Sequence, residues 1–290
     1  MDKPVGVTSH DVVSSVRRAA RTKRVGHAGT LDPFASGLLV LAVGACTRLL
    51  PYLASEPKVY DALIRFGQET DTDDHTGTVV RQASTPVALG WPVPLDAAMA
   101  SLTGDLQQVP PAFSAKHVDG QRAYALARHG VDVVLQPVPV TVHHWELLET
   151  RDDAVRVRIT CRGGTYIRAL ARDLGRALMS AAHCESLRRL SSGAATVDGS
   201  VPLNALEPGS IADGRVTVHA PLRFLEAMAH VPLDAPSLDA LVHGRSIAAT
   251  HVGARAAMLR DGDVVGIADR VIDQSGARWQ PRVVLLSGDA

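Results

Sequence analysis

One short segment of the chain gathers the residue types that catalysis requires. Residues 24–37 read RVGHAGTLDPFASG, so one carboxylate, Asp32, and one imidazole, His27, lie among several glycines. Glycine lets a backbone or a substrate approach closely, and the proline after Asp32 fixes the exit of the turn. Such a rigid loop can present a nucleophile or a base. It can equally be a tight turn in which the aspartate caps a backbone amide, and the pattern alone leaves both interpretations open.

A second cluster of carboxylates, DTDDHTG at residues 71–77, faintly resembles a calcium loop or an aspartyl-phosphate motif. His75 and Thr76 occupy positions where those sites need an oxygen ligand and a glycine, or a following threonine. We therefore expect a solvated acidic loop here and no metal. The chain also lacks the motifs of phosphate loops, dinucleotide-binding folds, zincins and hydrolase elbows. Those function classes have no support in the sequence.

The elements expected to position these residues are a mixture of helices and strands. Residues 8–20 show an amphipathic pattern with capping-box spacing between Thr8 and Asp11, which predicts a helix. Period-two alternation and short apolar segments predict strands elsewhere in the first half of the chain and around residue 150. The expected strands are Leu38–Val43, Val59–Phe66, Val140–Leu148 and Val155–Cys161, and a further helix is expected at Leu95–Leu102.

A longer amphipathic helix is expected at Tyr166–Leu178, directly after a glycine pair. Its apolar residues share one face, and arginines spaced by four residues occupy another. Basic residues also cluster on the outer face of the first helix. Such local basic patches can attract phosphate groups even in a chain of zero net charge, although a solvated surface is the alternative. The arginines concerned are Arg17, Arg18 and Arg21 on the first helix and Arg168, Arg172 and Arg176 on the later one.

Two segments fall outside this α and β order. Residues 109–139 carry proline pairs near both ends and a helix-like stretch at 122–128, which indicates a lobe inserted into the sheet. From about residue 229 the chain offers only short strand candidates separated by Asp-Gly turns, which favours a small β-rich C-terminal domain. These candidates are Ala256–Leu259, Val264–Ala268 and Arg282–Leu286.

The composition fits a soluble globular protein of about two domains. The 290 residues are 46% hydrophobic and 21% charged. The longest apolar run, residues 37–46, is about half of a bilayer span, and no secretion signal opens the chain, so we expect a cytoplasmic protein. Three widely separated cysteines form no CxxC pair, which gives no support to a disulfide framework or a zinc site.

Several ordered segments of the sequence are specific enough to identify a family. Residues 26–48 read GHAGTLDPFASGLLVLAVGACTR, and residues 162–175 read RGGTYIRALARDLG. Together with DKPVGVTSHDVV at the start and KVYDALIRFGQETDTDDHTG at residues 58–77, they closely resemble the TruB family. Its members are bacterial tRNA pseudouridine synthases that act on uridine 55 of the T-loop. The resemblance covers about residues 2–192, and residues 110–128 are similar to the family's inserted thumb.

The resemblance implies an α+β pseudouridine synthase fold, with a mixed, mainly antiparallel sheet flanked by helices. It implies a catalytic domain at residues 1–228 with a thumb insertion at about 104–140. A small PUA-like, RNA-binding C-terminal domain would occupy residues 229–290. The expected reaction is the isomerisation of uridine 55 in the T arm of tRNA, with no cofactor, no guide RNA and no membrane, by a monomer. The alternatives are a tRNA-folding chaperone without catalysis, a guide-RNA-dependent synthase of the same fold, and a metal-dependent hydrolase that uses residues 71–77.

Carried over residue by residue, the resemblance implies three catalytic positions. Asp32 would be the catalytic aspartate, Tyr60 would lie against the target base, and Arg168 would pair with Asp32. Phe113 stands where the family commonly has tyrosine, and the thumb lysine is shifted to Lys116 or lost. The implied RNA-binding positions are Lys3, His27, Gly29, Thr30, Lys116, Tyr166 and Arg172.

Overall fold

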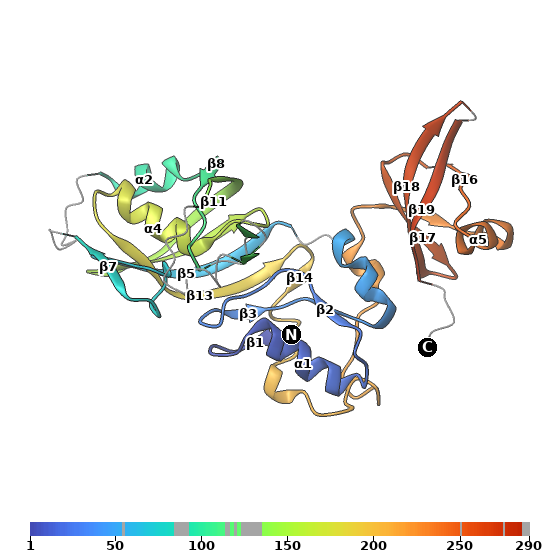
Figure 1. Cartoon of the computed structure of the whole chain (residues 1–290), viewed down its shortest axis with the longest axis horizontal. Helices are drawn as coiled ribbons and strands as arrows, with labels where there is room; N and C mark the ends of the chain where they lie inside the picture. Colours follow the sequence, from blue (N-terminus) through green and yellow to red (C-terminus); the bar gives the residue numbers. More distant parts are fainter. Residues whose placement is uncertain are drawn as a thin grey trace.

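The structure is a computed structural model that describes residues 1–53, 56–83, 93–113, 117–118, 121–122, 135–249, 251–274 and 276–285. Figure 1 shows a large part built around one long sheet and a smaller β-rich part formed by the C-terminal residues. Among the described residues, none of the helices combines the length and the apolar character that a transmembrane span needs.

Eight of the described strands form the sheet of the large part. Their order is β1-β3-β13-β5-β12-β11-β8, and β14 pairs with β13. Neighbouring strands are antiparallel except for the parallel pair β3 and β13. The expected mixed, mainly antiparallel sheet is therefore confirmed. The strands are β1 (Asp2–Lys3), β3 (Ser36–Leu38), β13 (Ala182–Ser192), β5 (Lys58–Phe66), β12 (Ala154–Cys161), β11 (Val138–Thr150), β8 (Gly104–Gln108) and β14 (Ala195–Thr196).

Helices and short ladders surround this sheet. The helices are α1 (Ser9–Ala19), η1 (Gly44–Tyr52), α2 (Leu95–Ser101), α4 (Ile167–Ala177), η2 (Leu203–Ala205) and η3 (Pro221–Phe224). Two-stranded ladders join β2 (Val25–His27) to β4 (Leu41–Val43), β6 (Gln68–Thr70) to β7 (Val79–Gln82), and β9 (His117–Val118) to β10 (Gln121–Arg122).

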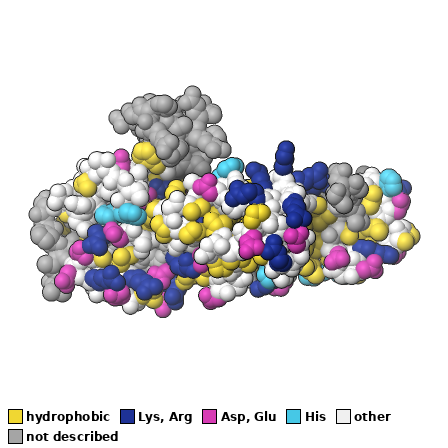
Figure 2. All heavy atoms as spheres, turned by 90° about the horizontal axis from the view of Figure 1, so that it is seen from below, with side chains coloured by type: hydrophobic (Ala, Val, Ile, Leu, Met, Phe, Trp, Pro, Cys, Tyr) yellow, Lys and Arg dark blue, Asp and Glu magenta, His cyan; other side chains and the backbone are white. Residues whose placement is uncertain are grey.

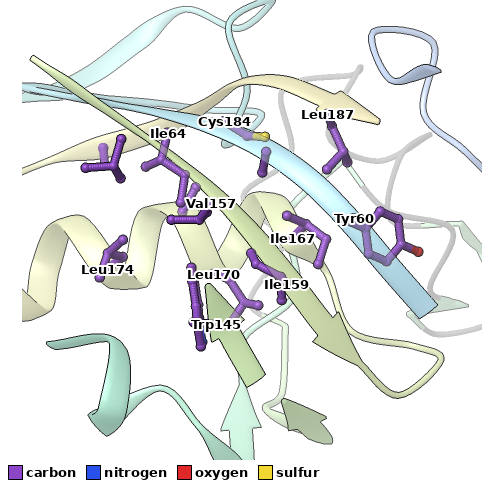
Figure 3. Packing of buried hydrophobic residues seen from close by; sticks show 14 of the residues in the cluster. Tyr60, Ile64, Trp145, Val157, Ile159, Ile167, Leu170, Leu174, Cys184 and Leu187 are labelled. Atoms are coloured by element: carbon purple, nitrogen blue, oxygen red, sulfur yellow. The ribbon is translucent and has the colours of Figure 1, made fainter. Parts of the chain in front are cut away.

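The main core lies between α4 and one face of the sheet (Figure 3). Ile167, Leu170 and Leu174 of the helix and Ile64 and Ile159 of the sheet are all almost completely buried. Burial of each such side chain contributes about 1.5 to 3 kcal/mol, so this contact fixes the position of α4 and of the residues at its start. The predicted helix and the predicted central strands are confirmed.

The C-terminal part has its own sheet, in the order β15-β17-β18-β19-β16. Its apolar core includes Trp279 and Met258, and a second cluster joins Leu49 of η1 to Ala257 and Ile267. The helix η1 follows the segment that carries Asp32 (residues 29–38, hereafter the Asp32 loop). It thus packs directly on the C-terminal sheet. The domain boundary expected at residue 228 stays a prediction. The elements are β15 (Ala229–Pro232), α5 (Ala235–Val242), β16 (Ile247–Ala248), β17 (Arg255–Arg260), β18 (Asp263–Asp273) and β19 (Gly276–Val284).

Three sequence predictions need correction. The single strand expected at Leu38–Val43 is two strands, because Leu39 N donates to Met1 O beside the main sheet and β4 then pairs with β2. The strand expected at Arg282–Leu286 begins earlier, as part of β19, and residue 286 lies outside the described residues. In the helix expected at 122–128, Arg122 belongs to β10 and the remaining residues are outside the described part.

Candidate active site

A cavity of about 450 Å³ opens where the Asp32 loop, β5, β13 and the start of α4 meet. Its walls bring together residues that are far apart in the sequence, among them the three predicted catalytic side chains. The lining residues used below are Gly29, Thr30, Asp32, Lys58, Tyr60, Phe113, Tyr166, Arg168 and Arg189.

The loop that carries Asp32 is fixed by the start of α1. Ser9 Oγ donates to Leu31 O and accepts from Leu31 N, each at 2.9 Å. Gly6 N donates to Pro33 O at 2.8 Å. These bonds hold the residues on both sides of Asp32, so its carboxylate has a defined direction toward the cavity.

Arg168 and Asp32 form the predicted pair. Arg168 Nε donates to Asp32 Oδ2 at 2.8 Å. The arginine side chain is only 5% exposed, whereas the aspartate side chain is 38% exposed and remains accessible from the cavity. The other arginine nitrogens donate to Thr72 O at 2.6 Å and to Phe113 O at 3.1 Å. Each of the three guanidinium nitrogens therefore has an acceptor in the protein. These bonds keep Arg168 from extending toward solvent and let it orient Asp32.

The DTDDHTG loop is only in part the solvated acidic loop that the sequence predicted, since Asp71, His75 and Thr76 are exposed but two of its carboxylates are buried. Asp73 and Asp74 are 5% and 4% exposed, and they face the arginines of α4. Asp74 lies 3.5 Å from Arg168, and Asp73 lies 2.7 Å from Arg172. Burial raises the pKa of Asp73 to about 6, against the effect of Arg172. The described residues contain no cluster of three or more His, Cys, Asp or Glu side chains placed to hold a metal ion.

Two residues expected to bind RNA are buried instead. Arg172 donates to Asp73, to Asp173 and to a backbone carbonyl, and it has almost no exposed surface. Lys3 is completely buried, and its ammonium donates to Val7 O at 2.6 Å and to Pro33 O at 3.4 Å. Burial lowers the pKa of Lys3 to about 8. An RNA contact does not fit this burial, so we assign both side chains to the support of the Asp32 loop and of the 71–77 loop.

Two tyrosines line the cavity. Tyr60 is buried on β5, and Figure 3 shows its hydroxyl turned away from the main core. Burial raises the pKa of Tyr60, so its phenol stays neutral near pH 7. Tyr166 caps the start of α4, where its backbone exchanges two hydrogen bonds with the Gln108 side chain. One aromatic ring therefore comes from the sheet and one from the helix start.

Of the remaining predicted residues, Gly29 and Thr30 line the cavity, whereas His27 is not among its lining residues. His27 is half-buried on β2, and its Nδ1 has no hydrogen-bond partner. Burial, followed by the charge of Arg189, lowers the pKa of His27. Gly29 and Thr30 lie between His27 and Asp32. Lys116 is outside the described residues.

Arg189 is a cavity residue that the sequence analysis missed. Its side chain is almost completely buried and donates to Leu38 O at 2.7 Å and to Gly29 O at 3.1 Å. Arg189 thereby connects the two ends of the Asp32 loop by hydrogen bonds. The only sequence signal was the Arg-Arg pair at residues 188–189, which lies on β13, a strand that the pattern did not predict.

This geometry agrees with a comparison of the sequence with protein families. Residues 17–167 match the model of the TruB family pseudouridylate synthase (N terminal domain). The chain belongs to the TruB family. The matched range includes Asp32 and Tyr60 and ends one residue before Arg168.

Curated TruB relatives align with almost the whole chain. "tRNA pseudouridine synthase B" of Thermobifida fusca is 43% identical over 297 residues, covering 98% of this chain and 96% of the relative. The protein of the same name from Mycobacteroides abscessus is 40% identical over 291 residues, covering 98% and 94%. The relationship therefore extends through the C-terminal sheet.

Solved structures support the same fold. A chain of the "Crystal Structure of a Cbf5-Nop10-Gar1 Complex" aligns with a TM-score of 0.70 at 22% identity, covering 99% of this chain and 84% of that chain. At this identity the likeness concerns the fold alone. It confirms the predicted pseudouridine synthase fold with a C-terminal β domain.

Proposed function

We propose that this chain converts uridine 55 in the T-loop of tRNA to pseudouridine, as an enzyme that needs no guide RNA. The observation that carries the proposal is the Asp32 carboxylate, held by Arg168 at 2.8 Å and open to a cavity with Tyr60 in its wall. The full-length relatives named tRNA pseudouridine synthase B support the same substrate. We also propose that the protein acts in the cytoplasm as a monomer.

The reaction needs only groups that the cavity contains. The N1–C1′ bond of uridine breaks, the base rotates, a C5–C1′ bond forms, and a proton leaves C5 while N1 gains one. There is no net oxidation or reduction, so the balance requires no cofactor. Asp32 is the one carboxylate lining the cavity among the described residues, which makes it our proposed nucleophile or base.

The target base has to leave the RNA stack to reach Asp32. Extrusion costs a few kcal/mol, and stacking on an aromatic ring returns about 1 to 3 kcal/mol. We propose that Tyr60 supplies this stacking, with Tyr166 beside it. Gly29 and Thr30, which line the cavity, and His27, which precedes them on β2, are our proposed contacts to the adjoining nucleotides.

We expect an unmodified tRNA transcript to gain one pseudouridine, at position 55, on incubation with the purified protein alone. Carbodiimide modification followed by primer extension maps the product. The Asp32→Asn variant is the matched control and should give no signal. Binding of the transcript without any pseudouridine would favour the tRNA-folding chaperone, and a product at another position would contradict the proposed specificity.

The arginines near the surface divide into two groups with different expected effects. Figure 2 shows Lys and Arg side chains on the surface between the large and the small parts of the molecule. Arg18 and Arg21 of the α1 region are exposed, whereas Arg172 is buried against Asp73. Only exposed cations can release counterions when they meet phosphates.

We therefore expect Arg18→Met to reduce the slope of log Kd against log salt by about one, and Arg172→Met to leave it unchanged. Titration of a T-stem-loop at several salt concentrations measures both slopes. A reduced slope for Arg172→Met would restore the RNA contact predicted from the sequence. An unchanged slope for Arg18→Met would indicate that the arginines of α1 are solvated and do not contact phosphates.

A further inference from the structure

Lys58 stands at the start of β5, two residues before Tyr60, and lines the same cavity. Its ammonium lies against two glycines. A Cβ atom on Gly29 would be 2.9 Å from Lys58 Nζ, and a Cβ atom on Gly163 would be 3.4 Å from it. The absence of side chains at these positions leaves the ammonium accessible to a group that approaches along the Asp32 loop.

The ammonium of Lys58 has no carboxylate partner within ion-pair distance among the described residues. The nearby carboxylate of Glu56 is already engaged, because it accepts from Arg162 Nε at 3.2 Å and from Gly163 N at 3.0 Å. A second cation lies nearby, since the same Cβ position on Gly29 is 3.7 Å from Arg189 Nη1. Burial and then the charge of Arg189 lower the pKa of Lys58.

Arg189 also lacks a carboxylate partner among the described side chains. Its nitrogens donate to the carbonyls of Gly29, Thr30 and Leu38, which leave its positive charge uncompensated. Two neighbouring cations are unfavourable in the folded protein, and the charge of Glu56 offsets only part of the effect of Arg189 on Lys58. The cavity thus has an excess of positive charge beside Gly29, and a bound anion would relieve it.

We propose that Lys58 binds a backbone phosphate of the target nucleotide, and that Arg189 strengthens this site by its charge without touching the RNA. The inference rests on the proposed function. Uracil and ribose are neutral, so the phosphodiester is the part of the substrate that supplies the missing negative charge. A nucleotide turned out of the stack carries its own phosphates toward the cavity, and lysine binds phosphate as a compact point charge.

The test combines one protein change with one substrate change. Single-turnover rates at increasing enzyme concentration give the Kd and the rate constant of the bound complex for a T-stem-loop. A methylphosphonate, which is neutral, replaces the phosphodiester on either the 5′ or the 3′ side of the target uridine. Wild type and Lys58→Met are measured with each RNA, and Lys58→Arg tests whether a cation alone restores binding.

We expect Lys58→Met to raise the Kd about 10- to 100-fold, as for the loss of a hydrogen bond to a charged group. One of the two methylphosphonates should weaken wild-type binding similarly but cause little further loss in Lys58→Met. This non-additivity identifies the contact. Lys58→Arg should recover most of the affinity. Lys23→Met, an exposed lysine outside the cavity, is the control, and its effect should multiply with that of either methylphosphonate.

Two results would overturn the inference. Losses that multiply for Lys58→Met with both methylphosphonates would show that Lys58 touches neither phosphate. A lower rate constant with unchanged Kd would assign Lys58 to a proton transfer. Failure of the proposed function is distinguishable, because wild type would then form no pseudouridine in the unmodified stem-loop. Thermal unfolding of each variant checks folding, and loss of an unpaired cation should not lower the stability.

Discussion

Asp32→Asn is expected to abolish pseudouridine formation while leaving tRNA binding close to that of wild type. The amide is nearly the same size as the carboxylate, but it can neither attack carbon nor accept a proton in the same way. Loss of a nucleophile lowers kcat by as much as about a million-fold in other enzymes. Release of tritium from 5-tritiated uridine in a tRNA transcript measures the rate, and filter binding measures the Kd.

Two checks make the result decisive. Mass spectrometry of the protein excludes deamidation of the new asparagine back to aspartate, which would restore activity. Thermal unfolding shows whether the fold is destabilised when Arg168 loses the charged acceptor of its 2.8 Å bond. Substantial turnover by a sample free of aspartate would remove Asp32 from the catalytic role.

Local patterns were sufficient for the elements whose ends and faces are set by nearby residues. The capping box of α1 is present, since Thr8 Oγ1 accepts from Asp11 N and Asp11 Oδ2 accepts from Thr8 N. The helix α4 was likewise predicted from its apolar period, and its buried face includes Leu170 and Leu174. The catalytic role expected for Asp32 depended on the family motif, because the loop pattern alone also fitted a tight turn.

The central strand β13 could not be predicted because several of its polar residues are buried by partners from distant segments. Arg189 is 1% exposed, yet its side chain donates to three carbonyls of the Asp32 loop, about 150 residues earlier in the chain. His183 similarly contacts Gln68 O. Alternation of polar and apolar residues is a weak signal when polar side chains lie on the buried face.

The arginines of α4 illustrate a different limit. Four-residue spacing correctly places Arg168 and Arg172 on one side of the helix, but it does not indicate what that side contacts. In the structure they contact the 71–77 loop, so this part of the predicted RNA-binding stripe is an internal ion-pair network, whereas Arg176 is 56% exposed and pairs with Glu69. The same contact explains why Asp73 and Asp74 of the acidic loop are buried. Neither loop nor helix reveals this pairing alone, since each reads as a solvated charged surface.

The second large effect is expected for Arg168→Met, which should lower both kcat and stability. Methionine removes the cation that orients Asp32 and leaves Asp74 buried without its nearest charged partner. Breaking one side of a buried ion pair costs about 3 to 5 kcal/mol. We therefore expect a clear loss in the free energy of unfolding in urea, and a loss of kcat measured at saturating RNA well below the unfolding temperature.

Arg172→Met separates these two effects because Arg172 lies one turn further along the same helix and faces the same loop. Its ion pair with Asp73, at 2.7 Å, is equally buried, but Arg172 donates to Asp73, Asp173 and a backbone carbonyl and not to Asp32. We expect a comparable loss of stability with kcat nearly unchanged. If both variants lost kcat in proportion to their stability, Arg168 would be a structural residue only. If Arg168→Met instead weakened RNA binding and preserved kcat, its role would move to the RNA-binding surface, and the backbone around Asp32 would have to orient the carboxylate by itself.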